Sequence, residues 1–397
     1  MEGKEKTSID YSNAVGKTLK IARVNFFVTL VGFLDTHLLI PVMALYVAGL
    51  GAGLGAVGLI VGLYSVTNTL TNLLGGRLVD RFGCKTPLIG GLVGDAVAMF
   101  GYALCRLPWH LALVRLFHGS SGGLVGPATM SIVAKHSSPL SRGKSMGFYG
   151  MAIALSTLLG YGGGGIIASR FGYEYVFYIG GLLLIVAIFL AGLMPKETGA
   201  VGDRVSWGDS VKKVTALLTN RNLRLSYWAI FAQYFAFGGI VALLPLYVTT
   251  LGMTAFHAGM LLATFSLMFI LIQIPGGYVA DNIGRLRPAI LGLSLAVISV
   301  VILPLAGTFS FMAMIMALYG IGYGFLFPSI SATVADFTMA DEYGRATGIF
   351  HALITVGVSV GAPVIGWVAS FWGIKVGLSL SASALFIVLV MAIFRAK

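Results

Sequence analysis

Residues 75–85 read GGRLVDRFGCK, and this short stretch decides how the rest of the chain is interpreted. It places basic residues, one Asp and several Gly between two long apolar runs, which is typical of a tight charged turn between helices. A similar stretch, GGYVADNIGRLR, covers residues 276–287, so that Asp281 follows Asp80 by 201 positions. A charged turn that repeats at a fixed spacing indicates a chain built from two copies of one unit.

The same spacing relates turn and helix residues over most of the chain. No insertion or deletion is needed to align Leu50-Gly51 with Leu251-Gly252, Gly119 with Gly320, Pro127 with Pro328, Gly147 with Gly348, Gly160 with Gly361, and Gly172 with Gly373. Each copy holds six apolar spans, an even number, so both copies enter a membrane in the same direction. Such halves are related by an axis along the membrane normal.

The composition predicts an all-α membrane protein. Of the 397 residues 57% are hydrophobic and only 10% are charged, against about 25% in soluble domains, and the mean hydropathy is +0.93. Crossing about 30 Å of hydrocarbon takes roughly 20 helical residues. Period-two patterns are absent, which favours helices over strands. We expect twelve transmembrane helices in two six-helix bundles around a central cavity, near 22–47, 56–76, 87–106, 110–134, 145–168, 175–194, 225–250, 257–280, 288–306, 310–334, 346–369 and 375–394.

The basic residues predict the orientation of these spans. The formal net charge is +12, yet nearly all Lys and Arg residues lie in the even-numbered connections and at the two termini. The exceptions are Arg106, Arg115, Arg170 and Lys375. This positive-inside pattern places both termini in the cytoplasm and argues against a nucleic-acid partner. Residues 1–20 are polar, so we interpret them as a cytoplasmic tail and not as a signal peptide.

The domain boundaries follow from the polar segments. We expect a tail at 1–20, a first bundle at 21–196, a linker with an amphipathic helix at 197–222 and a second bundle at 223–397. Cys84 and Cys105 lie at opposite ends of the third span, about 30 Å apart at 1.5 Å per residue. They are therefore too far apart to form a disulfide with each other, and they predict no metal site.

Three charged residues lie deep inside the predicted spans, away from their ends, and all three belong to the first copy: Asp35, Asp95 and Arg115. The equivalent positions of the second copy hold the uncharged residues Ala236, Ala296 and Met316. Ionisable groups inside a membrane are costly and usually functional. We hypothesise that Asp35 binds a proton and that Arg115 tunes its affinity; the alternative is a static ion pair that fixes two helices.

Other buried polar residues receive structural interpretations. Asp95 lies on the third helix and is predicted to serve in structural hydrogen bonding. His37 and His118 are predicted to be core histidines with satisfied hydrogen bonds. The fifth span is rich in Gly and Ala, which indicates close packing against another helix.

Four motifs together resemble the major facilitator superfamily, and the resemblance covers nearly the whole chain. The turn at 75–85 resembles the cytoplasmic signature between helices two and three, except that Cys84 stands where a basic residue is usual. RLFHG at 115–119 is similar to the fourth-helix motif with a buried Arg. LLGYGGGG at 158–165 and VGVSVGAPVIGW at 356–367 are similar to glycine-rich motifs of proton antiporters, although Tyr161 replaces the Pro that normally follows Gly160.

The resemblance implies a cytoplasmic gate. Asp80 would lie near the N-terminus of the eleventh helix, near 344–348, where the helix dipole favours an anion. In the alternative interpretation these charges only solvate the loop and anchor the topology. The gate residues would be Gly76, Asp80, Arg81, Gly83, Lys85, Asp281, Gly284 and Arg285. Helix packing and hinge residues would be Gly160, Gly164, Gly357, Gly361 and Pro363.

Helices one, two, seven, eight and ten supply the expected cavity. Aromatic side chains there could form a stacking wall for an amphipathic or cationic substrate, with amides as hydrogen-bond donors. The alternative is that these aromatic residues serve in packing and interfacial belts. The candidate residues are Phe33, Asn68, Gln233, Tyr234, Phe237, Gln273, Tyr319 and Tyr323.

These motifs predict a secondary transporter and not an enzyme. No Walker loop, zinc-ligand set or nucleophile elbow is present in the sequence. We expect a monomer in the cytoplasmic membrane, with lipid and a small-molecule substrate as partners, no cofactor, and the proton as coupling ion. Proton-coupled efflux of a drug-like compound is favoured. The alternatives are a proton symporter or uniporter for a sugar, an organic acid or another metabolite, and a receptor or scaffold that transports nothing.

Overall fold

The computed structural model describes residues 2–136, 142–194, 214–339 and 342–396. Within these ranges the side chains of residues 2–20, 80, 134, 142–144, 147, 343–344 and 396 lie outside the description. The first half contains α1 (Glu2–Gly49), α2 (Leu54–Phe82), α3 (Lys85–Ala103), α4 (Pro108–His136), α5 (Arg142–Phe171) and α6 (Tyr173–Gly192). The second half contains α8 (Arg221–Thr250), α9 (Ala255–Ile283), α10 (Leu286–Ile302) with the 3-10 turn η1 (Leu303–Leu305), α11 (Phe309–Asp336), α12 (Tyr343–Trp372), α13 (Ile374–Leu380) and α14 (Ser383–Ala396).

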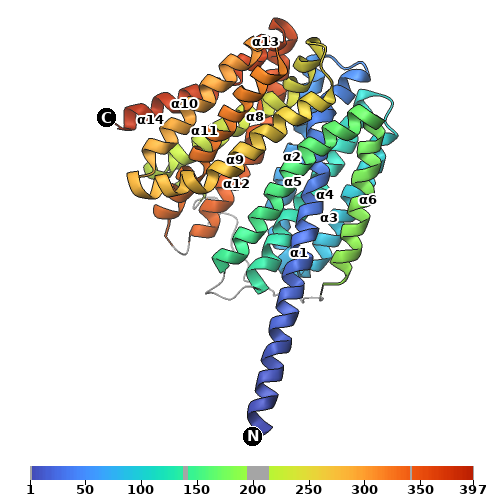
Figure 1. The fold of residues 1–397 in the computed structure, drawn as a ribbon, viewed down its shortest axis with the longest axis vertical. Helices are drawn as coiled ribbons and strands as arrows, with labels where there is room; N and C mark the ends of the chain where they lie inside the picture. Colours follow the sequence, from blue (N-terminus) through green and yellow to red (C-terminus); the bar gives the residue numbers. More distant parts are fainter. Residues whose placement is uncertain (1, 137–141, 195–213, 340–341, 397) are drawn as a thin grey trace.

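The all-α fold of two six-helix bundles is confirmed (Figure 1). Eleven spans among the described residues are long and apolar enough to cross a membrane, and α13 with α14 forms one of them. The remaining predicted span corresponds to α4, which carries Arg115, His118 and a run of Ser and Gly. One side of this helix packs against α1, α2 and α3, and Arg115, His118 and Ser121 are buried there, whereas apolar side chains such as Leu113 and Phe117 are exposed. Its polar side chains are therefore accommodated by protein.

The two ends of the chain differ from expectation in detail. The helix α1 begins at Glu2, so the predicted tail of residues 1–20 continues the first span as helix and extends beyond the bundle (Figure 1). Most of the predicted linker helix lies outside the described residues, and 214–219 are helical. Cys84 and Cys105 are both buried and form no disulfide, as predicted.

The internal duplication is visible in the backbone. All residues with positive φ in the described part of the chain are glycines, namely Gly51, Gly83, Gly172, Gly252, Gly284 and Gly373. They form three pairs at the 201-residue spacing, and each of them directly follows a helix or its terminal turn. Glycine adopts this conformation without steric cost, so the same turns end the same helices in both copies.

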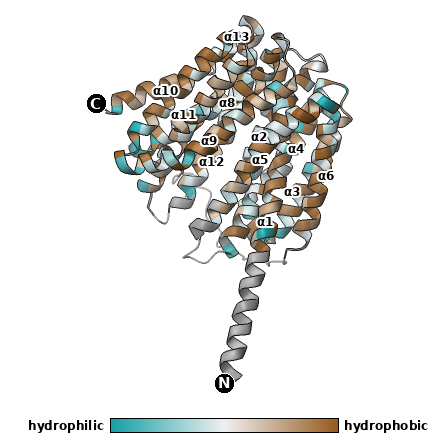
Figure 2. Cartoon of the chain, viewed as in Figure 1, coloured by the Kyte–Doolittle hydropathy of each residue, from teal (hydrophilic) through white to brown (hydrophobic). Residues whose placement is uncertain are grey.

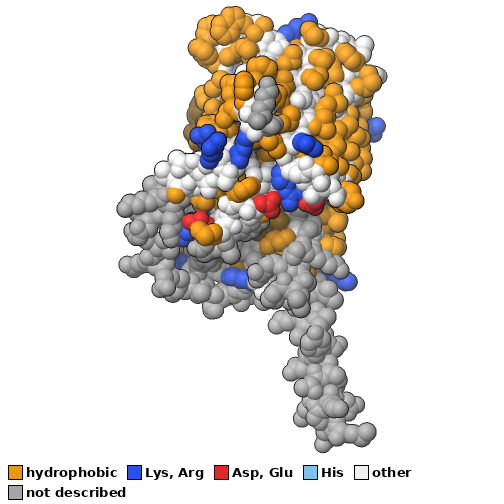
Figure 3. All heavy atoms as spheres, turned by 90° about the vertical axis from the view of Figure 1, so that its left-hand side faces the viewer, with side chains coloured by type: hydrophobic (Ala, Val, Ile, Leu, Met, Phe, Trp, Pro, Cys, Tyr) orange, Lys and Arg blue, Asp and Glu red, His pale blue; other side chains and the backbone are white. Residues whose placement is uncertain are grey.

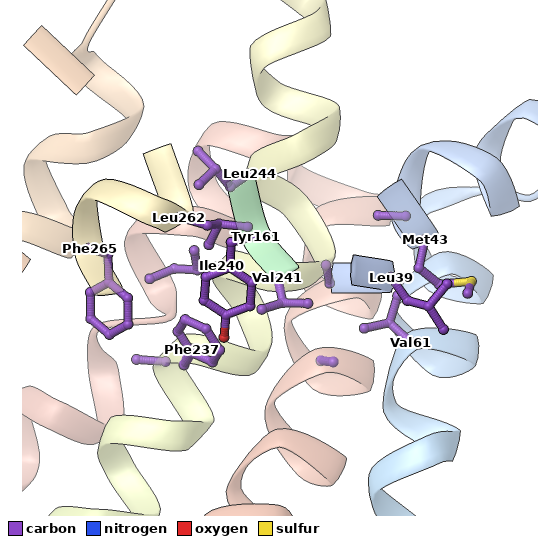
Figure 4. Packing of buried hydrophobic residues seen from close by; sticks show 14 of the residues in the cluster. Leu39, Met43, Val61, Tyr161, Phe237, Ile240, Val241, Leu244, Leu262 and Phe265 are labelled. Atoms are coloured by element: carbon purple, nitrogen blue, oxygen red, sulfur yellow. The ribbon is translucent and has the colours of Figure 1, made fainter. Parts of the chain in front are cut away.

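At one end of the molecule, where α2 and α9 begin, the two bundles pack tightly. A Cβ atom on Gly58 of α2 would lie 2.3 Å from the Ala362 carbonyl oxygen and 2.9 Å from Gly366 of α12. The symmetry-related crossing joins α5 and α9, where a Cβ on Gly259 would lie 2.9 Å from Gly165. Only glycine permits such close backbones. We call this end the closed end, and Figure 4 shows the apolar side chains that pack between the bundles.

Toward the opposite end the bundles diverge, and we call it the splayed end (Figure 1). A Cβ atom on Gly76 of α2 or on Gly348 of α12 would meet nothing within 4 Å. Between the two ends, the Thr69 hydroxyl donates a hydrogen bond of 2.6 Å to the Thr355 hydroxyl. The halves are therefore in contact at the closed end and near the middle of α2 and α12.

The outer surface suits a hydrocarbon environment. Large apolar side chains point outward, including Ile274, Leu305 and Phe189, which are 83%, 75% and 72% exposed. Figure 2 shows hydrophobic residues along the outer helices, and Figure 3 shows a continuous apolar face with Lys, Arg, Asp and Glu gathered along its lower margin. By contrast α8 is almost entirely covered by its neighbours. This pattern is the reverse of a soluble protein and fits a lipid-exposed perimeter.

Candidate functional site

Asp35 lies at the middle of the apolar span Ile21–Gly49 of α1 and is 1% exposed. Its carboxylate Oδ2 is 2.9 Å from Nε2 of His118 on α4. The other ring nitrogen of His118, Nδ1, is 3.1 Å from the hydroxyl of Tyr102 on α3. His118 is completely buried. Both of its ring nitrogens have hydrogen-bond partners, as was predicted for a core histidine. The prediction missed that its partner is Asp35.

Asp95 of α3 belongs to the same group. Its Oδ1 is 3.8 Å from Nε2 of His118, and it accepts a hydrogen bond of 2.5 Å from the Ser121 hydroxyl. Asp95 is 1% exposed. Its predicted structural hydrogen bond therefore exists, but the same carboxylate also faces the imidazole. We call Asp35, Asp95 and His118 the carboxylate–histidine cluster.

Arg115 does not bridge to Asp35, which corrects the expected direct pairing. Its Nη2 donates to the Val61 carbonyl at 2.9 Å and its Nε to the Ile60 carbonyl at 3.4 Å, both on α2. The guanidinium also lies 5.1 Å from the centre of the Tyr64 ring. Among the described residues, the group within 4 Å of the Asp35 carboxylate that can carry a positive charge is the His118 imidazole, which is charged only when it is protonated. The roles of Asp35 and Arg115 in proton coupling remain predictions.

A chain of hydroxyl and amide groups leads away from Asp35. Thr36 Oγ1 is 3.3 Å from Asp35 Oδ1 and 3.1 Å from the Tyr64 hydroxyl, and Asn68 Nδ2 donates to that hydroxyl at 3.3 Å. Gly122 of α4 leaves room for it, because a Cβ there would lie 2.7 Å from the Tyr64 oxygen. Thr36 and Tyr64 are partly exposed, so this chain connects the buried carboxylate with the cavity side of α2.

The second half contributes a continuous group of rings from α8, α9 and α11, which we call the aromatic wall. The wall consists of Tyr234, Phe237, Phe265, Phe269, Tyr319, Tyr323 and Phe327. Phe265 stacks on Tyr319 with centroids 4.9 Å apart, and Phe269 stacks on Tyr323 at 4.4 Å. Such distances are those of attractive aromatic pairs. Four of these rings, Tyr234, Phe237, Tyr319 and Tyr323, were among the residues predicted for the cavity, and the rings of α9 and Phe327 were not. Phe237, Tyr319 and Tyr323 are buried in this conformation, so their contact with a substrate stays a prediction.

The amides of the predicted cavity have different surroundings. Gln233 of α8 donates from Nε2 to the Tyr319 hydroxyl at 2.8 Å, while its buried Oε1 has no hydrogen-bond partner among the residues that the structure describes. Asn68 lies on α2 beside Tyr64, as described above. Phe33 lies against Gly126 of α4, within the first half, and Gln273 on α9 is half-buried. The structure therefore brings Gln233 to the wall and places Phe33 away from it.

His37 of α1 connects the first half with the wall. Its Nδ1 is 3.2 Å from the Ser156 hydroxyl and its Nε2 is 3.3 Å from the Thr157 hydroxyl, so both ring nitrogens have partners. The ring lies 5.5 Å from Tyr161 of α5, which in turn lies 6.5 Å from Phe237 (Figure 4). Tyr161 thus occupies the boundary between the bundles, in place of the Pro expected there.

At the splayed end, the predicted gate residues of the second half form an ion-pair network. Arg285 binds Asp281, four residues earlier at the end of α9, and its Nε donates to Asp336 of α11 at 3.0 Å. These hydrogen bonds raise the pKa of Arg285 above its usual value. Gly284 has a φ of 87° and turns the chain between α9 and α10.

The first half is built differently at this end. Lys85 donates from Nζ to the carbonyls of Gly192 and Met194 at 2.6 Å each, where α6 ends. Gly83 has a φ of 77°, and its counterpart Gly284 in the second half has a similar positive φ of 87°. Arg81 is exposed, and the side chain of Asp80 lies outside the described residues, as does that of residue 344. The proposed contact of Asp80 with α12 therefore remains a prediction.

The predicted packing residues lie where helices approach closely. A Cβ on Gly160 would lie 2.4 Å from the Cβ of His37, and one on Gly164 would lie 2.2 Å from the Leu38 carbonyl oxygen. On α12, a Cβ on Gly357 would lie 2.8 Å from the Phe231 carbonyl oxygen of α8, and one on Gly361 would lie 2.2 Å from the Phe235 carbonyl oxygen. Pro363 packs against Gly62 of α2.

One side-chain set has the spacing to hold a metal ion. Among the described residues, the ligand atoms of Asp35, Asp95 and His118 lie within 4.8 Å of one another. The short hydrogen bonds that already satisfy these side chains fit proton binding as well. We therefore interpret the set first as a group of proton acceptors.

Comparisons with known proteins agree with this architecture. Quinolone resistance protein NorA of Staphylococcus aureus is 27% identical over 356 residues, covering 84% of this chain and 86% of that protein. A homolog of the multi-drug resistance efflux pump PmrA from Lactococcus lactis is 26% identical over 359 residues, covering 86% and 87%. An uncharacterised MFS-type transporter of Methanocaldococcus jannaschii is 26% identical over 365 residues, covering 91% and 94%.

The fold matches solved structures at low sequence identity. A bacterial homolog of the human lysosomal transporter Spinster, in an inward-facing and unoccupied conformation, superposes with a TM-score of 0.79 at 14% identity, covering 95% of both chains. The sequence model of the Major Facilitator Superfamily matches residues 26–260 and 227–397. With the duplicated six-helix bundles, the signature turn and this match over almost its whole length, the chain belongs to the Major Facilitator Superfamily of transporters.

Proposed function

We propose that this transporter exports amphipathic or drug-like compounds in exchange for protons. The observation that carries the proposal is the division of the membrane interior into two chemistries. The charged groups Asp35, Asp95 and Arg115 all belong to the first half, whereas the second half offers the aromatic wall and, within its predicted spans, a single charged residue, Lys375 at the first position of the last span. One half would bind the coupling ion and the other the substrate.

The aromatic wall supports a substrate with a planar or cationic apolar body. Stacked rings provide broad apolar contact with few directional hydrogen bonds, so they accept varied ligands. A cation over an aromatic face gains further stabilisation. The unsatisfied Oε1 of Gln233 supplies a hydrogen-bond acceptor beside Tyr319. Two relatives named for drug efflux or quinolone resistance add support.

Orientation comes from the basic residues. Lys and Arg concentrate in the connections of the splayed end, which would therefore face the cytoplasm in the cytoplasmic membrane. In this orientation the closed end seals the outer side, and the conformation is inward-facing. Substrate would enter between the bundles from the cytoplasm. Rocking of the bundles about the middle of α2 and α12 would then expose it to the outside.

Asp35 would couple this motion to protons. A carboxylate in a dry site favours the protonated form, while contact with water or a cation favours the ionised form. Changes in hydration between the two conformations would thus load a proton on one side and release it on the other. The proton leaves to cavity water, and the negative charge that remains attracts a cationic substrate.

The experiment is transport of a permanently charged aromatic cation by purified monomer in proteoliposomes. A quaternary probe is chosen because it cannot accumulate by protonation, and protein-free liposomes serve as the control. Antiport predicts uptake into vesicles that are acidic inside. Symport predicts uptake into vesicles that are alkaline inside, and uniport predicts equal uptake in both, so either result would contradict the proposal.

The coupling residue is tested in the same assay. Asp35→Asn should lose accumulation driven by the pH gradient but keep exchange of labelled for unlabelled probe at equal pH. Glu174→Gln makes the same chemical change at an exposed position of α6 and should behave as wild type. Wild-type accumulation in Asp35→Asn would remove this carboxylate from the mechanism.

A further inference from the structure

We propose that the coupling proton is shared by Asp35, His118 and Asp95 and that its path to the cavity runs through Thr36 and Tyr64. This inference rests on the proposed proton coupling and extends it from one carboxylate to a unit built on three helices. It assigns proton binding to Asp95 and His118, which the sequence presents as structural residues.

The first argument is geometric. The imidazole of His118 stands between two carboxylates, with Nε2 at 2.9 Å from Asp35 Oδ2 and 3.8 Å from Asp95 Oδ1. A small rotation of the ring suffices to exchange one partner for the other. The Tyr102 hydroxyl at Nδ1 is the natural donor to that nitrogen, which places the ring proton on Nε2, between the carboxylates.

The second argument is electrostatic. The three side chains are at most 1% exposed, so the cluster is shielded from water. Two ionised carboxylates beside a neutral imidazole would put two like charges in a site that disfavours even one. A second proton on His118 or on a carboxylate removes one of these charges. The protons therefore belong to the unit, and titration of one member changes the others.

The other groups that face the carboxylate–histidine cluster do not change the conclusion that its protons are shared. Arg115 is held on the α2 carbonyls, and its guanidinium also contacts the Tyr64 ring and the Tyr102 hydroxyl, both of which lie against His118. Tyr102 and Tyr64 are phenols, which stay protonated near neutral pH. Ser121 hydrogen-bonds Asp95 from α4. Among the described contacts Arg115 pairs with neither carboxylate, so the direct counter-charge for Asp35 and Asp95 comes from a proton held within the unit, on His118 or on a carboxylate.

The third argument is the path. Thr36 and Tyr64 are partly exposed, whereas the cluster is not, and their hydroxyl groups lie 3.1 Å apart next to Asp35 Oδ1. Asn68 holds the phenol from the cavity side. A proton can pass from cavity water through these hydroxyls to the carboxylate, each oxygen accepting one proton and releasing another. Gly122 keeps the space that the phenol occupies.

The test compares Asp95→Asn, His118→Gln and Tyr64→Phe with wild type and with the Glu174→Gln control. Each protein is assayed for gradient-driven accumulation of the quaternary probe, for exchange at equal pH, and for protons released on probe binding in unbuffered detergent solution. We expect Asp95→Asn and His118→Gln to keep exchange within about twofold, to lose at least roughly tenfold in accumulation, and to shift the pH midpoint of binding by about one unit.

Tyr64→Phe keeps the ring over which Arg115 lies and removes only the hydroxyl. It should keep the pH midpoint of probe binding but slow gradient-driven uptake roughly tenfold, since the acceptor survives while its path is interrupted. Exchange at equal pH reports folding, so a variant that exchanges is correctly assembled. If a variant fails to exchange, Asp95→Glu is studied in its place, and the protons released on probe binding are counted. Asp95→Glu keeps a carboxylate as the proton acceptor and should release protons as wild type does.

The outcomes separate this inference from the function on which it rests. Wild-type accumulation and pH midpoint in Asp95→Asn and His118→Gln, together with loss in Asp35→Asn, would overturn the shared unit and leave proton antiport standing. Absence of any pH-gradient effect in the wild-type protein would instead overturn the proposed function. A wild-type uptake rate in Tyr64→Phe would overturn the path.

Discussion

The two halves of this transporter use one scaffold for different chemistry. At the 201-residue spacing, His118 of α4 corresponds to Tyr319 of α11, and Asp95 of α3 corresponds to Ala296 of α10. His118 lies between two carboxylates, whereas Tyr319 stacks on Phe265 and binds Gln233. The same position in the fold thus supports a titratable group in one copy and an aromatic wall in the other.

The glycine crossings, by contrast, are the same in both halves. Gly58 with Gly366 and Gly165 with Gly259 form two equivalent contacts at the closed end. Duplication has therefore kept the residues that let the bundles meet and has changed the residues that face the cavity. The comparison teaches that symmetry marks the moving scaffold and asymmetry marks the candidate sites.

The largest effect should come from breaking a shared crossing. Gly58→Leu and Gly259→Leu would each place side-chain atoms where a Cβ already comes within 2.3–2.6 Å of a backbone oxygen. Overpacking of this kind costs about 1–3 kcal/mol, so the ratio of molecules closed to molecules open at this end should fall by roughly five- to 140-fold. Transport rate and labelling of a cysteine placed at Gly55 would measure this.

The matched control for the crossings is Gly76→Leu, at a position where a Cβ meets open space in this conformation. It should leave labelling at the closed end unchanged. If Gly58→Leu and Gly259→Leu gave opposite changes in labelling, the two crossings would not be equivalent parts of one gate.

An intermediate effect is expected from the aromatic wall. Phe265→Ala removes the ring that stacks on Tyr319 at 4.9 Å. An aromatic contact is worth about 0.5–1.5 kcal/mol, so the apparent affinity for an aromatic cation should fall roughly three- to tenfold. The pH midpoint of binding should not move, because the titratable cluster lies in the other half. A moved midpoint would contradict the division of roles.

A smaller effect is expected where the first half ends α6. Lys85→Met would remove the ammonium group that binds two terminal carbonyls of this helix. A cation at a helix C-terminus contributes about 0.3–1 kcal/mol, so a modest decrease in thermal stability is expected. The midpoint of thermal unfolding in detergent measures it, with Arg81→Met as the control at an exposed position of the same turn. An equal decrease in the control would show that charge alone, and not the carbonyl contact, matters.

The smallest effect should be at the equivalent end of the second half. Arg285 is only partly buried and its partners are largely exposed, so Arg285→Ala should cost less than about 1 kcal/mol. Since the pKa of Arg285 is raised in the folded protein, its contribution is complete at any pH below the pKa of the unfolded chain, which is already strongly basic, and is lost only as the pH rises through the higher folded pKa. The difference in thermal stability between wild type and variant should therefore be constant from about pH 6 to 9. A difference that disappears at pH 9 would contradict this.

Much of the candidate site could be found by comparing the two copies in the sequence. Asp35, Asp95 and Arg115 stand out because their equivalents are uncharged. Which of them meet could not be found this way, because that depends on the rotation of α1, α3 and α4 about their own axes. One signal for His118 was present: Arg115, His118 and Ser121 recur every three residues, which places them on one face of α4.

The aromatic wall shows the same limit of prediction from sequence, here in the second half. Tyr234, Phe237, Tyr319 and Tyr323 were predicted as cavity residues from their helices, but Phe265 and Phe269 were missed because α9 was searched only for amides. The α4 span was predicted as one of twelve apolar runs, although it is not among the eleven spans that length and hydropathy identify in the described residues.

The sequence alone determined the membrane class, the number of helices and the duplication, because hydrocarbon selects apolar helices one by one and residue spacing records the repeat. Only the tertiary structure decided that Asp35 meets His118 and not Arg115, and that α9 completes the wall. Those contacts arise when glycine-lined helices pack at fixed rotations, so that side chains far apart in the chain come within hydrogen-bonding distance.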